Sequence, residues 1–204
     1  MKTPLQRIVL SALFIAFTCV ATMLIKFPTP AFGYIHVGDC MVLLCGVILG
    51  PGVGALAAGI GSALADLFSG YLVYVPATFV IKALTALLAG LLYRRMIKKA
   101  AGNGRKTFAL ILGGILGESF MVGGYFVFET FLAAFGDGGF SAQALSAGLL
   151  SSAASIPFNL VQGATGIILS VLLLPILMKV PFLRYKPLDH EAHSVAQEAH
   201  HSVK

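Results

Sequence analysis

The chain has 204 residues, of which 58% are hydrophobic and only 11% are charged, and its mean hydropathy is +0.92. A globular surface in water does not tolerate so much apolar area, which excludes a soluble protein. At about 20 residues per spanning helix, the length allows several membrane-crossing helices with short loops and no separate soluble domain. The composition therefore predicts a single all-α integral membrane domain.

Apolar segments predict a six-transmembrane-helix bundle within residues 1–187, followed by a polar tail over residues 188–204. The expected spans are 8–25, 37–49, 53–67, 75–93, 107–133 and 149–178. The second and third spans are short, and Gly50-Pro51-Gly52 between them predicts the tight turn of a helical hairpin. The third span also carries closely spaced small residues, typical of a helix that packs against a neighbouring backbone: Gly54, Ala57, Ala58, Gly61, Ser62 and Ala65.

Lysine and arginine gather on one side of this arrangement, near both chain ends and between residues 94 and 106. Only Lys26 flanks a span on the other side. Positive residues are retained in the cytoplasm, so we expect a plasma-membrane protein with both termini cytoplasmic. The loops at 26–36, 68–74 and 134–148 then face outward. The net charge of +6 is explained by this topology and requires no nucleic-acid partner.

No cofactor, metal or catalytic motif is evident in the sequence. Cys19, Cys40 and Cys45 lie in apolar stretches without metal-ligand spacing, which indicates buried, reduced thiols. The tail histidines do not form a closed ligand set: His190, His193, His200 and His201. Because no phosphate-binding loop or hydrolase signature is present, the chain is not expected to hydrolyse ATP itself or to act as an enzyme.

Five ionisable residues lie in or at the edges of the spans: Asp39, Asp66, Lys82, Glu118 and Glu129. Each is costly in lipid and is expected to face protein or a cavity. The two aspartates end the hairpin on its outward side, where helix capping and ligand contact are equally good interpretations. Lys82 needs an anionic partner, and we expect Asp66 or Glu129 to supply it.

Two helical faces predict the walls of a polar site. One lies on the fifth span, at spacings of seven and eleven residues: Glu118, Tyr125 and Glu129. The other lies on the sixth span, at spacings of four and seven: Ser155, Asn159 and Gln162. Pro157 beside this second stripe is expected to free a backbone carbonyl one turn earlier. Hydrogen bonding between helices is the alternative interpretation of both faces.

Aromatic and polar side chains occupy the first two outward loops: Phe32, Tyr34, His36, Tyr71 and Tyr74. Tyrosine is common at membrane surfaces as an interfacial anchor. Rings above a polar cavity also suit stacking on a flat heterocycle. The loops are therefore either anchors or a lid over a ligand.

Four blocks of sequence carry a resemblance to a known family. They are Pro28-Thr29-Pro30 through Gly33-Tyr34-Ile35-His36-Val37-Gly38-Asp39, then Leu49-Gly50-Pro51, Gly59-Ile60-Gly61-Ser62-Ala63-Leu64-Ala65-Asp66, and Pro76-Ala77-Thr78-Phe79 followed by Lys82. Together they resemble the S components, the substrate-binding subunits, of energy-coupling factor (ECF) vitamin transporters. The resemblance covers roughly residues 8 to 178 and is strongest for the branch that includes riboflavin-type S components.

The resemblance implies a six-helix protein that binds a vitamin or precursor from outside and joins a transmembrane T component and two cytoplasmic ATPases. It also implies that alanines spaced AxxxA on the first helix contact the T component, and Ala12 and Ala16 match that spacing. The outward loops would cover the ligand, and the later helices would bind it. The substrate remains open among riboflavin, pyridoxine, thiamine precursors and pantothenate.

The residues above and this resemblance together give one set of expected substrate-binding residues: Tyr34, His36, Asp39, Asp66, Tyr71, Tyr74, Lys82, Glu118, Tyr125, Glu129, Asn159 and Gln162. Two other classes of function are alternatives. One is a small membrane enzyme that uses Glu118 and Glu129 for acid–base chemistry, and the other is an assembly or regulatory subunit without a small ligand.

Overall fold

The computed structural model describes residues 4–28, 34–97, 102–136, 141–180 and 183. In chain order its helices are α1 (Pro4–Leu24), α2 (Asp39–Leu44), the π-helix η1 (Cys45–Leu49), α3 (Pro51–Phe68), α4 (Val75–Ile97), α5 (Asn103–Gly136), α6 (Ala142–Ala153) and α7 (Ile156–Leu177). Between α1 and α2 lies a small antiparallel ribbon of β1 (Lys26–Pro28) and β2 (Tyr34–His36), in which Lys26 pairs with His36.

Long apolar helices dominate the described part of the chain. Five helical stretches are long and apolar enough to cross a membrane, and the last of them joins α6 and α7 over Ala142–Leu177. The shorter apolar helix Asp39–Leu49 completes a bundle of six. The predicted all-α, six-helix membrane fold is therefore confirmed. Helix α5 has 34 residues and so extends about 50 Å, which exceeds the hydrocarbon thickness of about 30 Å.

The turn predicted at Gly50 is present. Gly50 has a φ of 95°, which a residue with a side chain rarely adopts, and Pro51 begins α3 directly after it. On the other side of the turn, α2 continues into η1 and is buried against α4. Gly46 allows this approach, because a Cβ atom there would lie only 2.1 Å from the carbonyl oxygen of Ala86.

Helix α3 packs tightly between α1 and α4. A Cβ atom at Gly61 would lie 2.7 Å from the carbonyl oxygen of Ile15 on α1, and one at Gly59 would lie 2.8 Å from that of Phe79 on α4. The small residues of α3 therefore permit backbone contact on two sides. In lipid such close packing, rather than a hydrophobic driving force, holds helices together.

The sixth predicted span is wrong in one respect, because residues 149–178 do not form a single helix. Helix α6 begins at a Ser141 cap, whose side chain accepts a hydrogen bond from the backbone N–H of Ala144 at 3.0 Å, and it ends before a turn. Pro157 then lies in the first turn of α7. A proline there replaces an N–H that has no helical partner, so it does not free a carbonyl inside a span.

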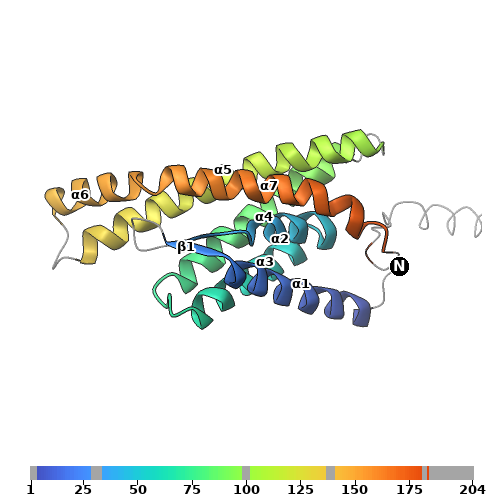
Figure 1. The fold of residues 1–204 in the computed structure, drawn as a ribbon, viewed down its shortest axis with the longest axis horizontal. Helices are drawn as coiled ribbons and strands as arrows, with labels where there is room; N and C mark the ends of the chain where they lie inside the picture. The colour runs from blue at the N-terminus through green and yellow to red at the C-terminus, as the bar shows by residue number, and fades with distance from the viewer. Residues whose placement is uncertain (1–3, 29–33, 98–101, 137–140, 181–182, 184–204) are drawn as a thin grey trace, which may run out of the picture.

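The start of α1, the end of α4, the start of α5 and the end of α7 lie at one end of the bundle, at the right of Figure 1, while β1, the α3–α4 turn and α6 lie toward the left. Arg94 and Arg95 in the last turn of α4 are near the first end. These two groups of segments therefore lie at opposite ends of the bundle.

Candidate functional site

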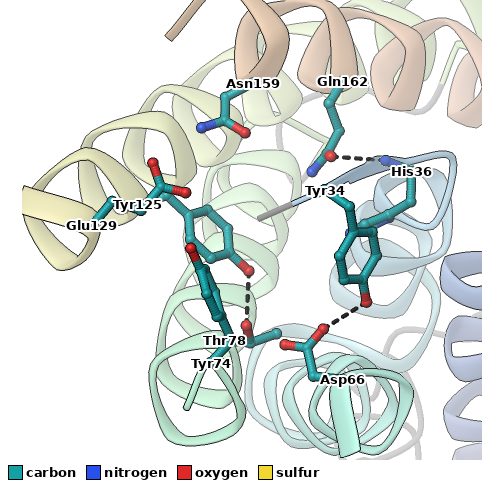
Figure 2. A pocket seen from close by; sticks show the side chains of 9 residues that line it. All are labelled: Tyr34, His36, Asp66, Tyr74, Thr78, Tyr125, Glu129, Asn159 and Gln162. Carbon is teal, nitrogen blue, oxygen red and sulfur yellow. Dashed lines mark hydrogen bonds between the residues drawn. The ribbon is translucent and has the colours of Figure 1, made fainter. Parts of the chain in front are cut away.

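A pocket opens near the end of the bundle that carries the β1–β2 ribbon. Its walls come from β2, α3, the start of α4, α5 and α7 (Figure 2). About 360 Å³ of space lies between its atoms, including the open mouth. Nine residues line it: Tyr34, His36, Asp66, Tyr74, Thr78, Tyr125, Glu129, Asn159 and Gln162.

One wall of the pocket is formed by Tyr34 and Asp66. The Tyr34 hydroxyl donates a hydrogen bond to Asp66 Oδ1 at 2.6 Å, which joins β2 to α3. Burial, reinforced by the charge of Asp66, raises the pKa of Tyr34, so the hydroxyl remains protonated and acts as the donor. The Tyr34 ring is tilted against that of Tyr71, with ring centres 4.7 Å apart. Tyr71 therefore supports the wall from outside the pocket.

The opposite wall is formed by α4 and α5. The hydroxyls of Thr78 and Tyr125 lie 3.0 Å apart and share a hydrogen bond. One turn further along α5, Glu129 is 5% exposed, and its Oε2 atom is buried without a hydrogen-bond partner among the described residues. Figure 2 shows this carboxylate and the amide of Asn159 at the edge of the same open space. The carboxylate can accept hydrogen bonds in that space, and the amide can both donate and accept them.

The third wall joins β2 to α7 through Gln162. The backbone N–H of His36 donates to Gln162 Oε1 at 2.9 Å. Burial lowers the pKa of His36 to about 3, so the imidazole is neutral, and its Nδ1 accepts a hydrogen bond from the Gly38 N–H at 3.0 Å. The imidazole therefore contributes a neutral ring, rather than a cation, to the pocket.

Asp39 and Lys82 lie behind Gln162 and are not among the lining residues. Lys82 Nζ pairs with Asp39 Oδ1 at 2.5 Å, and both side chains are fully buried. The expectation that Asp66 or Glu129 pairs with Lys82 is therefore wrong. The start of α2 packs against both α4 and α7, and this long-range contact brings Asp39 to Lys82.

Glu118 lies deeper than the other members of its predicted face. A Cβ atom added at Gly163 on α7 would lie only 2.9 Å from the Cβ atom of Glu118. Both carboxylate oxygens of Glu118 are buried without a hydrogen-bond partner among the described residues. Of the face on α5, Tyr125 and Glu129 line the pocket and Glu118 does not.

Comparison with known proteins places this chain in a family. A family model described as the ECF-type riboflavin transporter, S component, matches residues 2–179. The chain belongs to that family. Its S components are substrate-binding subunits and not enzymes, which sets aside the acid–base enzyme as an alternative.

Two further similarities concern parts of this S component. A solved structure, described as the S component of a bacterial ECF transporter, is 23% identical, with a TM-score of 0.57; the match covers 87% of this chain and 98% of that one. An uncharacterized protein from a gap 3′ region of Pyrococcus woesei is 41% identical over 107 residues. That match covers 52% of this chain and 66% of the relative, so it spans just under two thirds of the relative's length.

Sequence reasoning missed one lining residue of this S component, Thr78. It lies one helical turn before Lys82 and so shares a face of α4 with it, a signal that was present in the sequence. The predicted contact residues Ala12 and Ala16 are both exposed on α1. Phe32 and the histidines of the tail lie outside the described residues.

Proposed function

We propose that this S component captures riboflavin from outside the cell and delivers it to a transmembrane T component driven by two cytoplasmic ATPases. The observation that carries the proposal is a pocket with aromatic rings, the amide of Asn159 and carboxylates in a chain that matches the riboflavin-type family model. The ATPases hydrolyse the ATP, while this subunit supplies recognition.

The aromatic and amide groups suit the flat ring system of riboflavin. Its isoalloxazine ring offers a broad aromatic face and an edge with carbonyl oxygens and an N–H group. The rings of Tyr34, Tyr74 and Tyr125 provide surfaces for offset or edge-to-face contact. An amide such as that of Asn159 both donates and accepts hydrogen bonds, and so complements that edge.

The carboxylates suit the sugar-alcohol chain of riboflavin and disfavour a phosphate. Asp66 and Glu129 can accept hydrogen bonds from hydroxyl groups. The nine lining residues include no lysine or arginine, and His36 is neutral. A phosphorylated flavin would therefore place negative charge against two carboxylates with no cation among the lining residues. We expect free riboflavin to bind more tightly than flavin mononucleotide.

We expect Glu129→Gln and Asn159→Ala each to weaken riboflavin binding at least tenfold, or about 1.4 kcal/mol, because the first replaces an acceptor oxygen of the pocket by a donor and the second removes an amide. Calorimetry on the purified protein measures the affinity, and Ser146→Ala on the exposed surface of α6 serves as the control. If both variants bind like the parent, the pocket is not the ligand site. If pyridoxine, a thiamine precursor or pantothenate binds and riboflavin does not, the substrate assignment is wrong.

The pocket must open outward for this function, and we infer that both termini are cytoplasmic from the distribution of lysine and arginine. Single cysteines at Asn103 and Gly138, in a background without the three native cysteines, test this orientation in intact cells. An impermeant thiol reagent should label only position 138, which lies outside the described residues. Labelling of position 103 alone would reverse the proposed topology.

A further inference from the structure

The side-chain amide of Gln162 is held at both ends. Its Nε2 donates a hydrogen bond to Asp39 Oδ2 at 2.6 Å, and its Oε1 accepts one from the His36 N–H at 2.9 Å. The amide therefore links the first turn of α2, the strand β2 and helix α7. Gln162 is 3% exposed, so water does not compete strongly for these bonds.

The orientation of this amide is determined by the ion pair behind it. Lys82 contacts Asp39 Oδ1 at 2.5 Å, which leaves Oδ2 for Gln162. An ionised carboxylate only accepts hydrogen bonds, so Gln162 must turn its NH₂ group toward Asp39. Its carbonyl oxygen is then directed at the His36 N–H. The charge on Asp39 is thereby linked to β2 through the amide of Gln162.

Strand β2 has few other attachments. It has three residues and pairs with a strand of three residues, and a two-stranded ribbon of this kind is marginally stable alone. Among the described residues, the Tyr34–Asp66 bond and the bond from Gly38 to His36 are the other side-chain hydrogen bonds of this strand, and the Tyr34 ring also contacts Tyr71 and Lys26. Because Tyr34 and His36 line the pocket, loosening β2 would open one wall.

We propose that Asp39 and Lys82 are positioning residues: through Gln162 they hold β2 against the pocket and so prolong the time that a ligand stays bound. Neither residue lines the pocket. The part of this proposal that concerns ligand residence rests on the proposed function. The part that concerns β2 does not, and it is measured without a ligand.

Two double variants separate the bond to Gln162 from the charge of the pair. Asp39→Leu/Lys82→Met removes both charges and also the acceptor for Gln162. Asp39→Asn/Lys82→Met removes the same charges but keeps an oxygen that can accept from Gln162 Nε2. Replacing both members of a buried pair by neutral groups of similar volume is commonly tolerated. All nine lining residues stay unchanged in both variants.

The readout is hydrogen exchange of the His36 amide. The chain has five histidines and four lie in the tail, so ¹⁵N-histidine labelling gives a spectrum in which His36 is readily assigned. Exchange of the His36 amide should be at least tenfold faster than in the parent in Asp39→Leu/Lys82→Met, the leucine pair. In Asp39→Asn/Lys82→Met, the asparagine pair, it should stay within threefold of the parent. If the leucine pair does not fold, Gln162→Met removes the same link and should give the same increase.

Riboflavin dissociation, followed by its fluorescence, should change in parallel with the exchange rate. Unchanged exchange in a folded leucine pair would overturn the proposal, and so would equal acceleration in both pairs, since the effect would then not depend on the bond to Gln162. Faster exchange with an unchanged dissociation rate would overturn the link to ligand residence. A parent protein that does not bind riboflavin refutes the proposed function and leaves the exchange test intact.

Discussion

Lys82→Met is expected to lower the free energy of unfolding by about 3–5 kcal/mol, because it leaves the carboxylate of Asp39 buried without its cation. The Lys82 and Asp39 side chains are both fully buried, so neither water nor lipid headgroups can replace the lost partner. The second bond of Asp39 comes from the uncharged amide of Gln162, so it does not neutralise the charge. Denaturant unfolding of the purified protein in detergent measures the loss.

The matched control for this prediction is Asp39→Asn/Lys82→Met. It removes the unpaired charge and should recover most of the lost stability, because the cost of the single variant comes from an uncompensated charge rather than from missing contacts. If the double variant is as unstable as Lys82→Met, the loss comes from packing around Lys82. The cation–π contact of Lys82 with the Tyr125 ring, at 5.3 Å, would then be a candidate cause.

Ala12→Trp/Ala16→Trp is expected to abolish vitamin uptake while leaving ligand affinity unchanged. Both alanines are exposed on α1, whereas Leu10, Phe14 and Thr18 on the opposite face are buried in the protein. Small residues at i and i+4 allow another backbone to approach closely in lipid, and two indole rings would prevent it. The lining residues of the pocket include none from α1. Uptake in cells and co-purification with the T component measure docking, and calorimetry measures binding.

Phe17→Trp provides the control for bulk on α1. Phe17 is exposed and lies about 100° and 140° around the helix from Ala16 and Ala12, so it faces a different direction. Uptake should be retained in this variant. Parental uptake in the double tryptophan variant would remove the alanine face from the coupling interface, and loss of ligand binding would indicate that this face packs within the protein.

The helices were predictable from local patterns, because long apolar stretches and a Gly-Pro-Gly turn need no tertiary information. The break between α6 and α7 was not, since Ala142–Leu177 is apolar enough overall to pass for one spanning helix, and Pro157, which lies in the first turn of α7, is equally compatible with a kink inside a span. A Cβ at Gly148 would lie 2.6 Å from the carbonyl oxygen of Thr130, which shows how closely α6 approaches α5. Hydropathy contains no signal for such a contact.

The pocket was partly predictable for the same reason. Tyr125 with Glu129 and Asn159 with Gln162 lie on helical faces that the sequence reveals by spacing alone. The partner of Lys82 was not predictable, because Asp39 lies on a short helix that is buried on every side and so shows no amphipathic pattern. Thr78 is a small polar residue in an apolar helix, where satisfying a backbone carbonyl is as common as lining a site.

The π-helix η1 lies between α2, which begins at Asp39, and the Gly50 turn. A π-helix bonds each N–H to the carbonyl five residues back, so it holds one more residue per hydrogen-bonded turn than an α-helix. Deleting one residue from Cys45–Leu49 would convert this segment to regular α-helix and leave the rotation of α2 relative to the Gly50 turn nearly unchanged, because a π turn closes about the same rotation with one residue more. Asp39 would then still face Lys82 and Gln162. The segment between Asp39 and Gly50 can therefore lose one residue at η1 without disconnecting β2 from the ion pair.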